Sequence, residues 1–196
     1  MTETPQAWRE APREEMPQPG TGRWSRFKAA MLAEIRWKPE KTWPELQRIL
    51  LFGVPLLWFV SAISVAVGHL LGFRLGTDGQ RVTEMLHSHP LAAFLMGAFV
   101  APLLEEFFFR VLPRAIGKVV YPAASTMWPL AVVVTTVFAL AHINPEHPTF
   151  PLPQFLVGLV FWAMQIRFGL RGSVAMHACF NGSIFLLLLF GQSMAH

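Results

Sequence analysis

The stretch Ala101-Pro-Leu-Leu-Glu-Glu-Phe-Phe-Phe-Arg110 decides how the rest of the chain is interpreted, because it holds two acids and a base among apolar residues. The preceding run Leu91–Leu104 contains no charged side chain. A charge near the centre of a bilayer costs about 2.5–3.5 kcal/mol on insertion scales, so such groups usually mark a functional site or an internal ion pair. We therefore expect Glu105, Glu106 and Arg110 to lie in one membrane-spanning helix and to have partners there.

The composition is that of a membrane protein. The chain has 196 residues, of which 53% are hydrophobic and 14% are charged, whereas a soluble domain carries about 25% charged residues. Its net charge of +4 comes from basic loops, so we expect the lipid bilayer, and not nucleic acid, as the partner. The single cysteine, Cys179, excludes an internal disulfide and a multi-cysteine metal site.

Three regions follow one another along the chain. Residues 1–22 are rich in Pro, Glu, Gln and Gly, and we interpret them as a disordered tail. In residues 23–48, apolar side chains recur at helical spacing among Arg and Lys, which predicts an amphipathic helix at an anionic membrane surface. Packing of that helix on the membrane bundle fits the same pattern. Residues 49–196 form the membrane domain.

The membrane domain contains five apolar segments. The predicted fold class is therefore all-α, a polytopic membrane helix bundle of about five (four to six) transmembrane helices with an N-terminal amphipathic helix. The third and fourth segments are short for independent spans. The segments are Ile49–Phe73, Leu91–Leu112, Met127–His142, Leu152–Phe168 and Ser173–Phe190. The distribution of Lys and Arg among the loops places the N-terminus in the cytoplasm and the C-terminus outside, although Arg74 and Arg81 then fall outside as well.

The two acids of the opening stretch differ in their expected partners. Glu106 and Arg110 are four residues apart, so they share a helix face and are expected to pair. Glu105 points about 100° away and has no countercharge on its own helix. A carboxylate in a poorly solvated place has a raised pKa, which suits a general base near neutral pH. The alternative interpretation is a purely structural acid–base cluster.

Further polar residues lie in the third and fifth segments. His142 ends the third segment, and a helical hairpin turning at residues 123–124 would bring it to the depth of Glu105. His177 and Asn181 are four residues apart on one helix face. These residues would supply an orienting imidazole and two donors for a developing oxyanion. For His142 and His177 to meet, however, an intervening helix must be short, tilted or broken.

Three motifs resemble those of the CPBP family, which includes the CAAX prenyl proteases and bacteriocin-processing intramembrane peptidases. EEFFFR (Glu105–Arg110), FALAH (Phe138–His142) and HACFN (His177–Asn181) match EExxxR, FxxxH and HxxxN/D in order. The resemblance implies an intramembrane endopeptidase of the bacterial inner membrane that cuts a membrane-embedded or membrane-anchored protein substrate. Myxosortase-like enzymes, which act on C-terminal sorting tails, are one such group.

The resemblance also implies roles for the motif residues. Glu105 would activate a water that His142 helps to hold, His177 and Asn181 would stabilise the oxyanion, and Glu106, Arg110 and Phe138 would support them. We expect a glutamic peptidase without cofactor or metal; the alternative is a zinc enzyme with Glu105, His142 and His177 as ligands. A non-catalytic scaffold or immunity protein of the same fold is a further alternative. A transporter is disfavoured, because the first span carries few polar residues.

Overall fold

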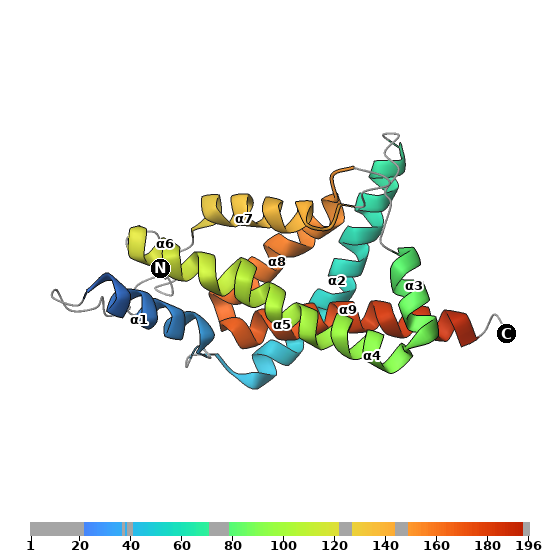
Figure 1. The fold of residues 1–196 in the computed structure, drawn as a ribbon, viewed down its shortest axis with the longest axis horizontal. Coiled ribbons are helices and arrows are strands. Elements are labelled where there is room, and N and C mark those ends of the chain that lie inside the picture. The colour runs from blue at the N-terminus through green and yellow to red at the C-terminus, as the bar shows by residue number, and fades with distance from the viewer. Residues whose placement is uncertain are drawn as a thin grey trace, which may run out of the picture.

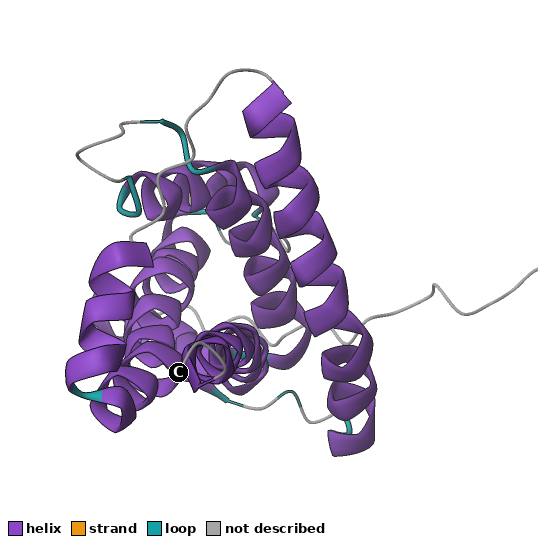
Figure 2. Cartoon of the chain, turned by 90° about the vertical axis from the view of Figure 1, so that its right-hand side faces the viewer, coloured by secondary structure: helices purple, strands orange, loops and turns teal. Residues whose placement is uncertain are grey.

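The computed structural model describes residues 22–36, 38, 41–70, 79–121, 127–143 and 149–193, and every regular element among them is a helix (Figures 1 and 2). The predicted tail (1–22, apart from Gly22) and the predicted hairpin turn at 123–124 lie outside the described residues. The elements are α1 (Arg23–Ile35), α2 (Trp43–Leu70), α3 (Gly79–Ser88), α4 (Pro90–Leu95), η2 (Met96–Val100), α5 (Ala101–Glu106), η3 (Phe107–Val111), α6 (Leu112–Val120), α7 (Trp128–Leu140), α8 (Leu152–Phe168) and α9 (Leu170–Ser193).

Three helices in the described part of the chain are long and apolar enough to cross a membrane. They are Trp43–Leu70, Pro90–Val120 and Leu170–Gly191, with α7 and α8 as shorter apolar helices. The all-α helix bundle predicted from the sequence is confirmed, and so is the shortness of its third and fourth apolar segments.

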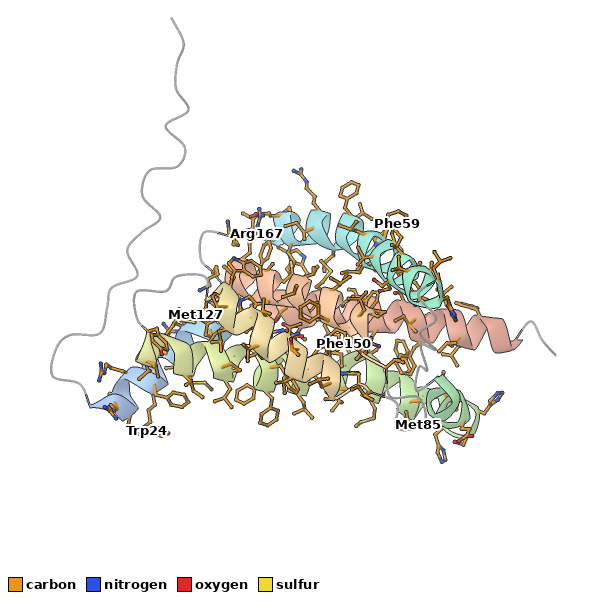
Figure 3. The ribbon with its side chains drawn as sticks, turned by 90° about the horizontal axis from the view of Figure 1, so that it is seen from above. Trp24, Phe59, Met85, Met127, Phe150 and Arg167 are labelled. Carbon is orange, nitrogen blue, oxygen red and sulfur yellow. The ribbon has the colours of Figure 1, made fainter. Side chains whose placement is uncertain are left out.

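The outer surface of the bundle is apolar. On α2, Phe52 and Phe59 are 74% and 62% exposed, and Figure 3 shows Phe59 pointing away from the other helices. A soluble monomer rarely exposes a large continuous apolar patch. This surface therefore fits contact with lipid acyl chains, which makes the chain a membrane protein.

The helix α9 is the centre of the bundle. It contacts α2, α8, α4, η2 and α5, and Figure 2 shows it nearly end-on beside the C-terminus, with other helices around it. Its side chain Met176 packs in a core with Phe161 and Phe168 of α8 and Leu46 and Leu57 of α2. Residues of α9 consequently contact helices from the early, middle and late parts of the sequence.

In the region 23–48, predicted to hold an amphipathic helix, residues 23–35 form α1, which packs beside α6 (Figure 1), whereas residues 43–48 belong to α2. Its Glu34 is fully buried, whereas Trp24 at the other end is 64% exposed. Trp24 lies at the outer tip of the helix in Figure 3, stacked on Phe27. The end of α1 that carries Glu34 is thus buried in the bundle, and the end that carries Trp24 is open to its surroundings.

Candidate active site

The motif acids lie in a single 31-residue helix, Pro90–Val120, that is interrupted by two π-helical turns. These turns, η2 and η3, flank α5, which carries Glu105 and Glu106. Wide π turns inside α-helices occur frequently at functional sites. A proline stands two residues after each turn, Pro102 after η2 and Pro113 after η3, and proline has no N–H for the carbonyls that precede it in the helix.

The first of these prolines gives Asn181 a backbone acceptor. In η2 the N–H of Ala101 bonds to the carbonyl of Met96, five residues earlier. Pro102 cannot make the next bond of this series, to the carbonyl of Gly97. That carbonyl instead accepts a hydrogen bond of 3.1 Å from Nδ2 of Asn181 on α9. The backbone interruption therefore joins η2 to α9.

The second proline lies near the backbone contact of the arginine. Pro113 has no N–H to donate to the preceding turn, and in that turn the carbonyl of Phe109 accepts a 3.2 Å bond from Nη1 of Arg110. Nη2 of Arg110 donates to the carbonyl of Gly158 on α8 at 3.3 Å. A Cβ at Gly158 would lie 3.2 Å from Nη2 and 2.6 Å from Cγ2 of Thr135, so a glycine is required for this approach.

Glu106 is the buried centre of the site. Its side chain and that of Arg110 are both 0% exposed, and Oε2 lies 3.7 Å from Nε of Arg110. The predicted pairing on one helix face is therefore present. Its other oxygen, Oε1, lies 2.9 Å from Nδ1 of His177 on α9. Since an ionised carboxylate only accepts hydrogen bonds, Nδ1 of His177 carries the proton.

Glu105 lies on the other side of the same imidazole. Its side chain is 26% exposed, and its Oε2 lies 3.6 Å from Nε2 of His177. The sequence predicts no countercharge for Glu105 on its own helix, and the structure places His177 of another helix next to it. In space the site is a series of contacts from Arg110 to Glu106, from Glu106 to His177 and from His177 to Glu105. The buried pair of Arg110 and Glu106 lies on one side of the histidine, and the accessible acid Glu105 lies on the other.

Phe138 connects His142 to this cluster. Its buried ring lies 4.6 Å from the ring of His142 and 6.3 Å from that of His177 between centroids, and 4.8 Å from the guanidinium carbon of Arg110. The helix α7 has 13 residues, or about 20 Å at 1.5 Å per residue, which is less than the thickness of the hydrocarbon core. The shortness of α7, which ends just before His142, therefore fits the approach of both His142 and His177 to one phenyl ring.

The protonation of His142 follows from its backbone contact. Its Nδ1 lies 2.8 Å from the carbonyl of Phe138, and a carbonyl only accepts, so Nδ1 carries a proton. In the neutral ring Nε2 is then an acceptor. His142 is partly exposed, so this acceptor suits the binding of a water or a substrate N–H.

The residue that the sequence did not reveal is Phe161 of α8. It is 1% exposed, and its ring stacks on His177 with a centroid distance of 4.2 Å and an interplanar angle of 23°. A buried aromatic residue in an apolar helix has no signal that distinguishes it from any other core residue. The two prolines, by contrast, could have been recognised, because a proline inside a helical pattern predicts a local interruption.

All of the predicted site residues except Asn181 belong to one group of contacts. Glu105, Glu106, Arg110, Phe138 and His177 contact one another directly or through a shared partner, and His142 joins them through Phe138. Asn181 is four residues from His177 but, among the described contacts, bonds to Gly97 and not to either acid. In the described part of the chain, no three His, Cys, Asp or Glu side chains are grouped closely enough to hold a metal ion.

The comparisons with known proteins agree with this geometry. Residues 87–183 match the family model described as type II CAAX prenyl endopeptidase Rce1-like, a segment that begins at the end of α3 and contains all three motifs. No curated protein and no solved structure matches the chain. On the family match, residues 87–183 form a domain of the type II CAAX prenyl endopeptidase Rce1-like family, within a membrane-type helix bundle.

Proposed function

We propose that the protein is an intramembrane glutamic endopeptidase that hydrolyses a peptide bond in, or next to, a membrane-anchored segment of another protein. The observation that carries the proposal is the pair of unlike carboxylates on either side of His177. Glu106 is sealed from solvent at 2.9 Å from Nδ1, whereas Glu105 is 26% exposed at 3.6 Å from Nε2. Only Glu105 is accessible to a water and a substrate.

The hydrolysis follows from these positions. Glu105 removes a proton from the water as the water oxygen bonds to the scissile carbonyl carbon, and Nε2 of His142 accepts a hydrogen bond from the remaining O–H. The carbonyl oxygen becomes an oxyanion, towards which His177 and Asn181 donate. Glu105 then transfers its proton to the leaving nitrogen as the C–N bond breaks, so the reaction consumes one water.

Oxyanion stabilisation sets a condition on His177. Because Nδ1 donates to Glu106, Nε2 donates only when the ring is a doubly protonated imidazolium. Arg110 balances the charge of Glu106. We infer that Glu106 and Arg110 serve catalysis by holding the orientation of His177.

The proposed setting follows from the topology. The protein would lie in the inner membrane of a bacterium with its N-terminus in the cytoplasm, as the basic residues of its loops indicate. Its substrate would carry a membrane anchor, and a C-terminal sorting tail of the kind cut by myxosortases is one such anchor. Enzyme and substrate would meet within the bilayer, which is why the apolar exterior surrounds a polar site.

The decisive experiment replaces Glu105 by Ala and by Gln in the native host. Membrane proteomes of wild-type and variant cells are compared for anchored proteins that accumulate as longer precursors. We expect at least one precursor to accumulate, with a loss of cleavage of about a hundredfold or more. Glu84→Gln, which changes an exposed carboxylate on α3, serves as the control and should process normally.

Two results would contradict the proposal. Normal processing by a folded Glu105→Ala protein would indicate the non-catalytic scaffold or immunity protein. Loss of activity of the purified enzyme on chelation, with recovery on adding zinc, would indicate the metal-dependent version that uses Glu105, His142 and His177. We expect activity to survive chelation.

A further inference from the structure

A second buried acid lies outside the segment that matches the family. Glu34 of α1 is 0% exposed, and its two carboxylate oxygens contact cations of α6. Oε2 accepts a 2.8 Å hydrogen bond from Nε of Arg114, and Oε1 lies 3.1 Å from Nζ of Lys118. The proposed hydrolysis does not use this acid. A buried carboxylate is costly unless cations and hydrogen bonds compensate its charge, and here Arg114 and Lys118 do so.

Glu34 is also connected to α8 and α9. Nε2 of Gln165 donates to the Glu34 backbone carbonyl at 2.9 Å and to Oε2 at 3.0 Å. The amide oxygen of Gln165 in turn accepts a 3.0 Å bond from the hydroxyl of Ser173. Gln165 and Ser173 are both fully buried. One residue of α1 therefore joins three helices of the bundle through hydrogen bonds.

These contacts lie one helical turn from the active site on both of its helices. On the motif helix, Arg110 pairs with Glu106 and Arg114, four residues later, pairs with Glu34. On α9, Ser173 lies four residues before His177, which bonds to Glu106. Residues four apart share a helix face. The Glu34 contacts and the Glu106–His177 contact thus connect the helix Pro90–Val120 with α9 at two levels, one helical turn apart.

The backbone is shaped to admit α1 at this point. Gly169, between α8 and α9, has a φ of +72°, which side chains other than glycine rarely adopt. A Cβ at this position would meet the backbone carbonyl of Arg36 and would lie 3.3 Å from that of Glu34. The end of α1 is therefore seated directly against the turn that begins α9.

We propose that Glu34 is a positioning residue of the active site, which holds α6 and α9 in the register that places Glu106 against His177. The inference rests on the proposed function and extends it to α1, outside the family segment. An error of about 1 Å in the position of a catalytic group can reduce turnover by about a hundredfold. A link one turn away that fixes both helices would prevent such an error.

The test compares Glu34→Gln with Glu45→Gln in protein purified in lipid nanodiscs. Glu45 also joins two helices, through a 2.6 Å contact with Arg167, but on the exposed surface. The first readout is the downfield ¹H NMR resonance of the His177 Nδ1–H, which its bond to Glu106 protects from exchange. We expect this signal in the wild type and in Glu45→Gln, and its loss in Glu34→Gln.

The second readout is turnover of a precursor identified through Glu105→Ala. We expect kcat of Glu34→Gln to fall by about tenfold or more with KM nearly unchanged, and no change in Glu45→Gln. The resonance needs no substrate, so this inference is tested even if no peptidase activity is found. Retention of the resonance, or an unchanged kcat, in folded Glu34→Gln protein would overturn it.

Ser173→Ala provides the test if Glu34→Gln does not fold. It removes the hydroxyl that joins α9 to Gln165 and leaves the ion pairs of Glu34 with α6 in place. We expect the folded variant to show the same loss of the His177 resonance and a reduced kcat. A Ser173→Ala protein that retains both would show that the link does not position His177.

Discussion

Glu34 and Glu106 are both fully buried carboxylates beside an arginine of the motif helix, but they are bonded differently. Both oxygens of Glu34 lie within 3.1 Å of a cation, and an amide reaches Oε2 as well. Glu106 has one short contact, of 2.9 Å to His177, and its contact with Nε of Arg110 is 3.7 Å long. The first acid is closely surrounded by donors, and the second directs its strongest bond at a histidine.

The difference separates a structural contact between helices, at Glu34, from the candidate active site at Glu106. A buried acid with a cation within 3.1 Å of each oxygen fixes helices. Around Glu106 the contacts are longer: in the described part of the chain, Oε2 of Glu106 and Nε of Arg110 are buried without a hydrogen bond and lie 3.7 Å apart, whereas Oε1 of Glu34, which also lacks a hydrogen bond, lies 3.1 Å from Nζ of Lys118. The incomplete bonding of Glu106 and Arg110 is costly, and it is located next to the accessible Glu105. The contrast is open to test by removing partners from each acid.

The largest effect on stability is expected from Arg110→Ala, which leaves Glu106 buried without its cation. Breaking a buried pair from one side costs about 3–5 kcal/mol, so the thermal midpoint in detergent should fall by roughly 10 °C. Peptidase activity should fall with it, because His177 loses a charge-balanced partner. The measurements are folded yield, thermal unfolding and precursor cleavage.

The control for this variant is Arg167→Ala. Its guanidinium is 53% exposed and contacts Glu45 at 2.6 Å, so water replaces the lost contact. We expect little change in the thermal midpoint. If Arg110→Ala unfolds at the wild-type temperature and retains its activity, Arg110 does not support Glu106 and the contrast between the two acids is lost.

A smaller effect is expected from Gly158→Ala, which tests the space around Arg110. The added Cβ would lie 2.6 Å from Cγ2 of Thr135 and 3.2 Å from Nη2 of Arg110. Overpacking of this kind costs about 1–3 kcal/mol, and it should disturb the bond from Arg110 to the Gly158 carbonyl. Gly191→Ala, where nothing lies within 4 Å, should not lower the thermal midpoint. Equal midpoints for the two variants would show that α8 yields at no cost.

The sequence predicted what depends on spacing within one helix. The pairing of Glu106 with Arg110 and the helical bundle follow from periodicity and hydropathy, and both are present. Contacts between helices require rotations and depths that one sequence does not contain. For this reason the bonds of His177 to Glu106 and of Asn181 to Gly97 could not be predicted, although Pro102 marked the place where the second would form.

The same limit explains why Glu34 was not recognised. It is one acid in a helix that also carries arginine and lysine, so its sequence context is that of a surface residue. Its burial depends on Arg114, Lys118 and Gln165, which lie 80 or more positions later. A motif of adjacent acids in an apolar helix is visible in one segment, whereas a cluster assembled from four helices is visible only after folding.

The smallest effect, and the one specific to Glu34, is expected from acid. Burial raises the pKa of Glu34, but Arg114, followed by Lys118 on the same helix and Gln165 on α8, outweighs it and holds the pKa below its usual value. The stability that this carboxylate contributes is therefore present above the pKa of the unfolded chain, about 4.3, and is lost as the pH falls through the lower folded value. The midpoint difference between wild type and Glu34→Gln should accordingly be constant from pH 7 to about 5.5 and should shrink below about pH 4.5. Other acids titrate in both proteins and cancel in this difference, which thermal unfolding in detergent measures. A difference that grows on acidification would mean that the folded protein favours the protonated form of Glu34, and its cations would then not hold it as a carboxylate.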